Sequence, residues 1–192
     1  MADTQRCYCV AEHNAPLQLR TGAVPTPKGR EVLVKVTGAG VCHSDIHIWE
    51  GHYDLGGGKK LSLKDRGIAL PLTMGHEIAG EIIAAGPDAK AAKIGAKVVV
   101  YPWLGCGECP TCKRGDENLC LKGRSLGVFI DGGYSTHVVV PDAKYCIDLG
   151  ALDAAEAAPL ACSGVTTFSA LKKFGAKIKD EPVVIIGAGG LG

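Results

Sequence analysis

The sequence lacks a long apolar segment, a run of like charge and a signal for export. No stretch of its 192 residues approaches the roughly 18 consecutive apolar residues of a membrane span. The net charge is only +1, with basic and acidic residues scattered, so neither a nucleic-acid groove nor an anionic membrane surface has electrostatic support. The N-terminus has no basic segment followed by an apolar one. We therefore expect a cytoplasmic protein whose ligand is a small molecule, with no nucleic acid and no membrane as partner.

The sequence does contain nine cysteines, and four of them form a dense cluster. Cys106, Cys109, Cys112 and Cys120 follow the spacing C-x2-C-x2-C-x7-C. Four thiolates around a tetrahedral zinc ion leave no open position, which predicts a structural site. A disulfide cluster and a redox pair at Cys109 and Cys112 are the alternatives. Zinc is favoured because three cysteines so closely spaced cannot pair without strain, and because no strand pattern precedes the pair.

Short valine-rich segments with a period of two predict strands between about residues 31 and 148. The clearest of these are residues 32–37, 80–85, 97–101 and 134–140. Glycine and proline separate the segments, and such spacing predicts a compact, barrel-like β domain. Residues 54–71 are polar and glycine-rich without a clear period, so we expect a surface loop near the bound ligand. We assign residues 1–150 to this domain.

The pattern changes beyond residue 149. Asp153 and Glu156 form a capping box in its Asp form, and residues 166–174 predict a helix that ends at Gly175. The continuous apolar run 183–186 is typical of a strand buried on both faces of a parallel sheet.

Glycines follow this run in the spacing G-x-G-x-x-G, at Gly187, Gly189 and Gly192. Behind a buried strand this is the fingerprint of dinucleotide binding, because the glycines permit a tight turn and a close approach of the backbone to pyrophosphate. We therefore assign residues 151–192 to the start of an α/β Rossmann domain.

Three further candidate metal ligands come from separate segments. Cys42 follows one predicted strand, His76 precedes another, and Cys162 lies at the start of the helical region. Two cysteines and one histidine form a neutral shell around Zn²⁺ with a fourth position open, as expected of a catalytic metal. Each residue alone has an ordinary structural interpretation, but the set predicts a catalytic zinc site.

Over essentially its whole length the chain resembles the zinc-dependent alcohol dehydrogenases of the medium-chain dehydrogenase/reductase family. The family's structural-zinc spacing matches the four-cysteine cluster, and its catalytic-zinc motifs match Cys42, His76 and Cys162. The resemblance implies a GroES-like barrel followed by a Rossmann domain, two zinc ions per chain, and NAD between the domains, with NADP as the alternative. It implies reversible hydride transfer between a primary or secondary alcohol and the cofactor, with the alkoxide on the catalytic zinc.

The resemblance also assigns roles near the catalytic zinc. Ser44 would take the proton of the alcohol, and His47 would pass it to solvent. Asp45 would orient the zinc-bound histidine, a role that the general behaviour of metal ligands also supports. Glu77 falls where the family has a glutamate close behind the zinc that binds it transiently.

Further roles concern the cofactor and the substrate. His43 matches a position that contacts the cofactor pyrophosphate, and Thr166 matches one near the nicotinamide. Tyr53 and Trp103 would line the substrate pocket. An ordinary structural role is equally compatible with these four residues. The cofactor-binding turn would comprise Gly187, Gly189, Gly190, Leu191 and Gly192.

Two features depart from the family. Cys42 and His76 lie 34 positions apart, a wider gap than is common, and the surplus is the segment 54–71, which we expect to border the substrate entrance. The helix and the acidic residue that should follow the glycine motif are absent from the sequence. We expect a homo-oligomer in which further polypeptide completes the Rossmann sheet, and a chain that by itself binds zinc without NAD-dependent turnover. The alternatives are a related zinc reductase of another carbonyl substrate and a zinc-binding, non-catalytic fragment.

Overall fold

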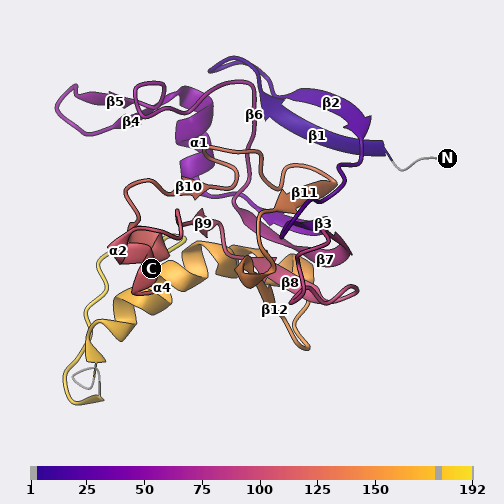
Figure 1. Ribbon diagram of the computed structural model, residues 1–192. Coiled ribbons are helices and arrows are strands. Elements are labelled where there is room, and N and C mark those ends of the chain that lie inside the picture. The colour runs from indigo at the N-terminus through magenta and orange to yellow at the C-terminus, as the bar shows by residue number, and fades with distance from the viewer. Residues whose placement is uncertain (1–3, 176–178, 192) are drawn as a thin grey trace.

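The computed structural model describes residues 4–175 and 179–191 and is built on antiparallel sheets (Figure 1). The largest sheet has five strands in the order β11-β3-β7-β8-β12. These strands are β3 (Val32–Gly40), β7 (Glu77–Ala85), β8 (Lys97–Val100), β11 (His137–Val140) and β12 (Cys146–Asp148). A three-stranded sheet in the order β2-β1-β6 consists of β1 (Thr4–Val10), β2 (Gln18–Ala23) and β6 (Leu72–Thr73). Two short pairs join β4 (His52–Asp54) to β5 (Lys60–Ser62) and β9 (Trp103–Leu104) to β10 (Arg124–Ser125).

The central strands of the large sheet are buried on both faces. On one face Val34, Ile78 and Val100 are fully buried in the main apolar core. On the other face Ala79 and Val99 pack against four alanines that follow the sheet: Ala154, Ala157, Ala158 and Ala161. The β-branched side chains that predicted the strands therefore also form the core.

The two sheets do not close into a barrel. β11 and β12 are the outer strands of the large sheet, and no pairing joins them in the part of the chain that the structure describes. The smaller sheet instead meets the segment before β11, where the N–H of Tyr8 donates to the carbonyl of Tyr134 (2.8 Å) and that of Thr136 to the carbonyl of Arg6 (2.8 Å). The prediction of a β-rich domain is confirmed, but closure into a barrel is not found.

The helices are short and follow or connect the strands. They are α1 (His43–Glu50), α2 (Pro110–Lys113), α3 (Ala154–Ala157) and α4 (Ser163–Lys172), with 3-10 segments at Glu117–Leu119, Ala143–Tyr145 and Ala158–Ala161. The Asp153 side chain caps α3 by accepting the N–H groups of Ala155 and Glu156, and α4 confirms the predicted helix. None of the helices in residues 4–175 and 179–191 is both long and apolar enough to cross a membrane.

The predicted buried strand at residues 183–186 is wrong for this structure. These residues form no strand, and Val184 and Ile186 are 81% and 97% exposed. A parallel strand needs a neighbouring strand and covering helices, and the described residues supply neither. The assignment of residues 151–192 to a Rossmann domain therefore stays a prediction.

The segment 54–71 is more ordered than a surface loop. Its first part is the β4–β5 hairpin, and its second part is anchored by Leu63 and Ile68, which are 0% and 7% exposed. Both side chains pack in an apolar cluster with Val10 and Ile48. The segment has no regular period because it is a hairpin followed by a turn.

The core predicts a large difference between two isoleucines. Ile78→Ala removes a fully buried side chain between β3 and β8, and should lower the free energy of unfolding by about 2–5 kcal/mol. Ile94→Ala is the control, because Ile94 is 61% exposed and should cost less than about 0.5 kcal/mol. Urea denaturation of the zinc-loaded chain measures both, and equal effects would contradict the assigned core.

Candidate metal centres and substrate cavity

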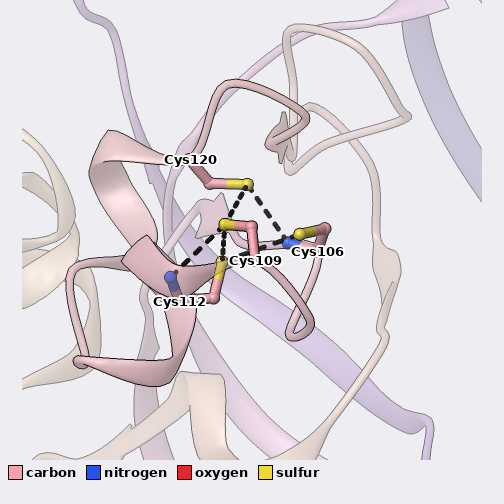
Figure 2. A group of neighbouring side chains, drawn as sticks. All are labelled: Cys106, Cys109, Cys112 and Cys120. Atoms are coloured by element: carbon pink, nitrogen blue, oxygen red, sulfur yellow. Dashed lines mark hydrogen bonds between the residues drawn. The ribbon is translucent and has the colours of Figure 1, made fainter.

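The four clustered cysteines come together around one point (Figure 2). Cys106 follows β9, Cys109 caps α2, Cys112 lies within α2, and Cys120 follows the Glu117–Leu119 segment. The Sγ atoms of Cys109 and Cys112 are 3.5 Å apart, those of Cys109 and Cys120 3.8 Å, and those of Cys106 and Cys112 3.9 Å. Sulfurs at 2.3 Å from a tetrahedral zinc ion would be about 3.8 Å apart. The cluster therefore fits a zinc ion, and all nine cysteines of the chain are free thiols rather than disulfides.

Backbone N–H groups support negative charge on this cluster. The N–H of Cys112 lies 3.4 Å from Cys109 Sγ, and that of Cys106 lies 3.5 Å from Cys120 Sγ. Hydrogen bonds from the backbone of Glu108 and Cys109 lower the pKa of Cys106 to about 6, whereas burial raises the pKa of Cys112 to about 12. Because thiolates at this spacing repel one another, a cation between them is needed for all four to lose their protons.

The second candidate metal centre joins residues that are distant in the sequence. Cys42 lies between β3 and α1, His76 directly before β7, and Cys162 directly before α4. The Sγ atoms of Cys42 and Cys162 are 4.0 Å apart, and one potential ligand atom from each of the three residues lies within 4.8 Å of the others. Two sulfurs and one imidazole nitrogen suit zinc with a further position left for another ligand.

Asp45 contacts two of these three candidate ligands, Cys42 and His76. Its side chain is 3% exposed, and it accepts hydrogen bonds from the N–H of Cys42 (2.9 Å) and the N–H of Gly75 (3.3 Å). Its Oδ1 lies 3.4 Å from Nδ1 of His76, which leaves Nε2 of that ring for an ion. Burial opposes a charge on His76, but Asp45 and Cys162 outweigh burial and raise the pKa of His76 to about 11. The predicted proximity of Asp45 to the histidine agrees with this contact, and its orienting role stays a prediction.

Tyr134 is a further partner of Asp45 that the sequence did not indicate. Its hydroxyl donates to Asp45 Oδ2 at 3.0 Å across 89 positions of sequence. Burial and the neighbouring Asp45 raise the pKa of Tyr134 above its usual range. Its ring packs against Gly75, where φ is +90° and an added Cβ would lie 2.5 Å from the ring. Only glycine satisfies both conditions at position 75.

Glu77 connects two of the candidate ligands. It is 3% exposed, and its Oε1 accepts the N–H of Ser163, the residue after Cys162, at 3.1 Å. Gly40 makes room for this carboxylate, since a Cβ there would lie 2.2 Å from Glu77 Oε2. Glu77 thus lies close to the centre as expected, while its role as a transient ligand stays a prediction.

The candidate proton-relay residues lie on α1. Ser44 Oγ is 3.9 Å from Cys42 Sγ. The His47 ring lies 4.8 Å from the ring of His43 and 4.7 Å from that of Tyr53, measured between centroids. Ser44 and His47 share one helical turn, and no direct hydrogen bond joins these two described residues. A relay between them would therefore need an intervening group.

A cavity of about 670 Å³ opens beside the second centre. It is lined by Ser44, His76 and Cys162, and also by the predicted pocket residues Tyr53 and Trp103. Arg66, Gly67 and Ile68 line it as well, so the segment 54–71 borders this cavity, while its place at a substrate entrance stays a prediction.

The candidate cofactor residues are not gathered in the same way. Thr166 is exposed on α4, and its N–H donates to the carbonyl of Cys162 at 2.9 Å. Gly187, Gly190 and Leu191 lie in an exposed segment, and Gly189 has open space where its Cβ would be. Gly192 lies outside the described residues. The described residues of this set by themselves do not form a cradle for a dinucleotide.

Comparison with known proteins identifies the class. The profile of the alcohol dehydrogenase GroES-like domain matches residues 28–151, and the chain belongs to this family. It is 43% identical over 185 residues to an NAD-dependent alcohol dehydrogenase of Saccharolobus solfataricus, covering 96% of this chain and 52% of that protein. The resemblance to zinc-dependent alcohol dehydrogenases is thereby confirmed.

Solved structures agree with this assignment. The D-arabinose dehydrogenase of Sulfolobus solfataricus matches with a TM-score of 0.83 and 34% identity, covering 98% of this chain and 55% of that one. A thermostable alcohol dehydrogenase from Pyrobaculum aerophilum, with cobalt and zinc bound, matches with a TM-score of 0.76 and 28% identity, covering 90% and 49%. The chain thus spans about half the length of the proteins it matches.

The contact between Tyr134 and Asp45 predicts a loss of metal affinity in Tyr134→Phe. Removing a residue that orients a metal-binding histidine typically costs about 10–100-fold in affinity, and losing the partner of such a residue should cost a part of this. Chelator competition with the zinc-loaded chain measures the zinc affinity of the weaker of its two candidate sites. Tyr8→Phe is the control, because Tyr8 is exposed. Unchanged affinity in Tyr134→Phe would show that the hydroxyl does not support the centre.

Proposed function

We propose that the chain forms the metal-binding and substrate-facing half of a zinc-dependent alcohol dehydrogenase that acts reversibly on primary or secondary alcohols with NAD. The observation that carries the proposal is the convergence of Cys42, His76 and Cys162 beside a cavity that also contains Ser44. The names of the Saccharolobus and Pyrobaculum proteins support alcohol as substrate, and the former supports NAD. Further polypeptide would have to complete the cofactor site, because the described residues do not form one.

The two proposed zinc ions would have different roles, because their donor atoms differ. The four-cysteine cluster would hold one ion and brace the segment between β9 and β10. Cys42, His76 and Cys162 would hold the other, which when bound supplies Lewis acidity at the substrate oxygen. Asp45 fixes the imidazole orientation, and Glu77 fixes the backbone next to Cys162.

The proton would leave through α1. In the direction of oxidation, Ser44 Oγ accepts the hydroxyl proton of the alcohol, and the proton passes on towards His47, whose ring lies against Tyr53. The hydride leaves the carbinol carbon as the carbonyl forms, and the nicotinamide cofactor is its acceptor. Tyr53 and Trp103 would limit the space around the substrate.

A sugar or polyol substrate is the second candidate. It is favoured by the similarity to the D-arabinose dehydrogenase, which covers nearly all of this chain. A panel of simple alcohols and aldoses would separate the two candidates. We keep the expectations of a cytoplasmic location and a homo-oligomer as proposals.

The proposal predicts two zinc ions per chain. Cys42→Ser should leave one, because it removes a sulfur from the three-residue centre while the four-cysteine cluster stays intact. Elemental analysis after dialysis measures the content. Cys7→Ser is the control, since Cys7 belongs to neither centre, and it should retain two. One ion in the unaltered chain would contradict the second centre.

Ser44→Ala should lower turnover by roughly 10²-fold, the usual contribution of a positioned proton acceptor. The assay joins this chain to the remaining half of the Saccharolobus relative, whose name states dependence on NAD, and follows NADH formation. Ser125→Ala is the control, because Ser125 lines the same cavity on β10. Full turnover by Ser44→Ala, with Ser125→Ala also unchanged, would remove Ser44 from the proton path.

A further inference from the structure

The cavity beside the candidate catalytic centre is lined by basic side chains from separate parts of the chain. Arg66 comes from the turn after β5, Lys122 comes from the segment that leads into β10, and Arg124 is the first residue of β10. Figure 1 draws the β4–β5 hairpin above β10 and α2 below it. Cationic residues that are distant in sequence therefore face one space.

Arg66 is presented by a well-anchored turn. Its N–H donates to the carbonyl of Leu63 at 3.1 Å, and the following Gly67 adopts a φ of +81°. Leu63 and Ile68, on either side of the turn, are buried in an apolar cluster. The backbone that carries this exposed guanidinium is therefore held in place.

Lys122 and Arg124 are also carried by short, bonded segments. Lys122 lies in a turn closed by a hydrogen bond from the N–H of Gly123 to the carbonyl of Cys120 (3.0 Å). Arg124 pairs with Leu104 across β10 and β9. Its Nη2 donates to the carbonyl of Phe129 at 3.1 Å, and its guanidinium lies 5.4 Å from the centre of the Phe129 ring.

The cavity has little negative charge to balance these cations. Glu117 is the one acidic residue among its described lining residues, and its carboxylate is already engaged by Lys144, Tyr145 and the N–H of Gly105. Its contacts with Lys144 and Tyr145 lower the pKa of Glu117. Among the described ion pairs, none includes Arg66, Lys122 or Arg124.

Lys122 and Arg124 have an alternative role, which is to balance the charge of the four-cysteine cluster. With a divalent ion its formal charge is negative, and Cys120 lies beside Lys122 in the same turn. Arg66 has no such explanation, because it belongs to the segment 54–71 rather than to the segment between β9 and β10. Arg66 therefore distinguishes a role in the cavity from one in balancing the cluster.

We infer that the substrate of the proposed dehydrogenase carries an anionic group, a carboxylate or a phosphate, which Arg66 and Lys122 attract into the cavity beside Cys42, His76 and Cys162. The inference rests on the proposed function for the reacting hydroxyl or carbonyl. A cleft lined by charge of one sign concentrates ligands of the opposite sign. The guanidinium group matches the oxygens of carboxylate and phosphate, while the ammonium acts as a point charge.

The test measures binding to the zinc-loaded chain and needs no turnover. The probes share one benzyl alcohol frame: 4-(hydroxymethyl)benzoate, 4-(hydroxymethyl)phenyl phosphate and the neutral 4-methylbenzyl alcohol. NMR titration should show at least one anion binding about ten-fold more tightly than the neutral probe at low salt. This preference should shrink in about 1 M salt, where the Debye length is about 3 Å. The tighter anion identifies the group that the cavity takes.

Variants locate the effect. Arg66→Gln and Lys122→Gln should each reduce the preference several-fold, and the double variant should abolish it. Lys59→Gln removes the same charge from the exposed tip between β4 and β5, outside the described cavity lining, and should keep the preference. Retained zinc content in each variant shows that the centres remain intact.

Equal affinity for neutral and anionic probes overturns the inference, as does failure to bind any probe or a preference that survives the double variant. These outcomes are separable from failure of the proposed function. If the fusion oxidises 4-methylbenzyl alcohol and oxidises the anionic alcohols no faster, the proposed alcohol dehydrogenase is supported and the anionic substrate is contradicted. If the anions bind selectively but the fusion oxidises no alcohol, the anion-binding site is supported and the proposed dehydrogenase activity is contradicted.

Discussion

The buried carboxylate of Asp45 is the contact on which the candidate catalytic centre depends. A carboxylate in the interior is costly unless hydrogen bonds satisfy it. Asp45 receives the N–H of Cys42 and the hydroxyl of Tyr134, and it faces the ring of His76. Asp45 lies on α1, and these partners come from the residue before α1, the segment before β11 and the segment before β7. One side chain thus fixes the relative positions of residues that local structure alone would leave independent.

A second buried carboxylate completes the arrangement from the other side. Glu77 follows His76 and accepts the backbone N–H of Ser163, so that Cys162 is tied to the strand that begins directly after the histidine. Gly40 contributes only space, because any larger residue would collide with Glu77. Two sulfurs and an imidazole supply donor atoms for a metal ion, and the two carboxylates beside them supply negative charge. A divalent cation suits such a group.

The sequence predicted most readily what depends on neighbouring positions. The four cysteines lie within 15 residues and could be grouped by spacing, and short apolar segments, valine-rich in all but one case, located β3, β7, β8 and β11. Tyr134 could not be found in this way, because its contact with Asp45 spans 89 positions and follows no local pattern. The run 183–186 was interpreted as a strand from its apolar character, but strand formation needs pairing partners that a local pattern does not supply.

The proposed dehydrogenase requires one metal ion to lie among Cys42, His76 and Cys162, with the neighbouring cavity open to substrate. Crystals of the zinc-loaded chain measured on both sides of the zinc absorption edge test this most directly. We expect an anomalous peak among the sulfurs of Cys106, Cys109, Cys112 and Cys120, and a second peak bonded to Cys42, Cys162 and Nε2 of His76. A single peak confined to the four-cysteine cluster would contradict this expectation.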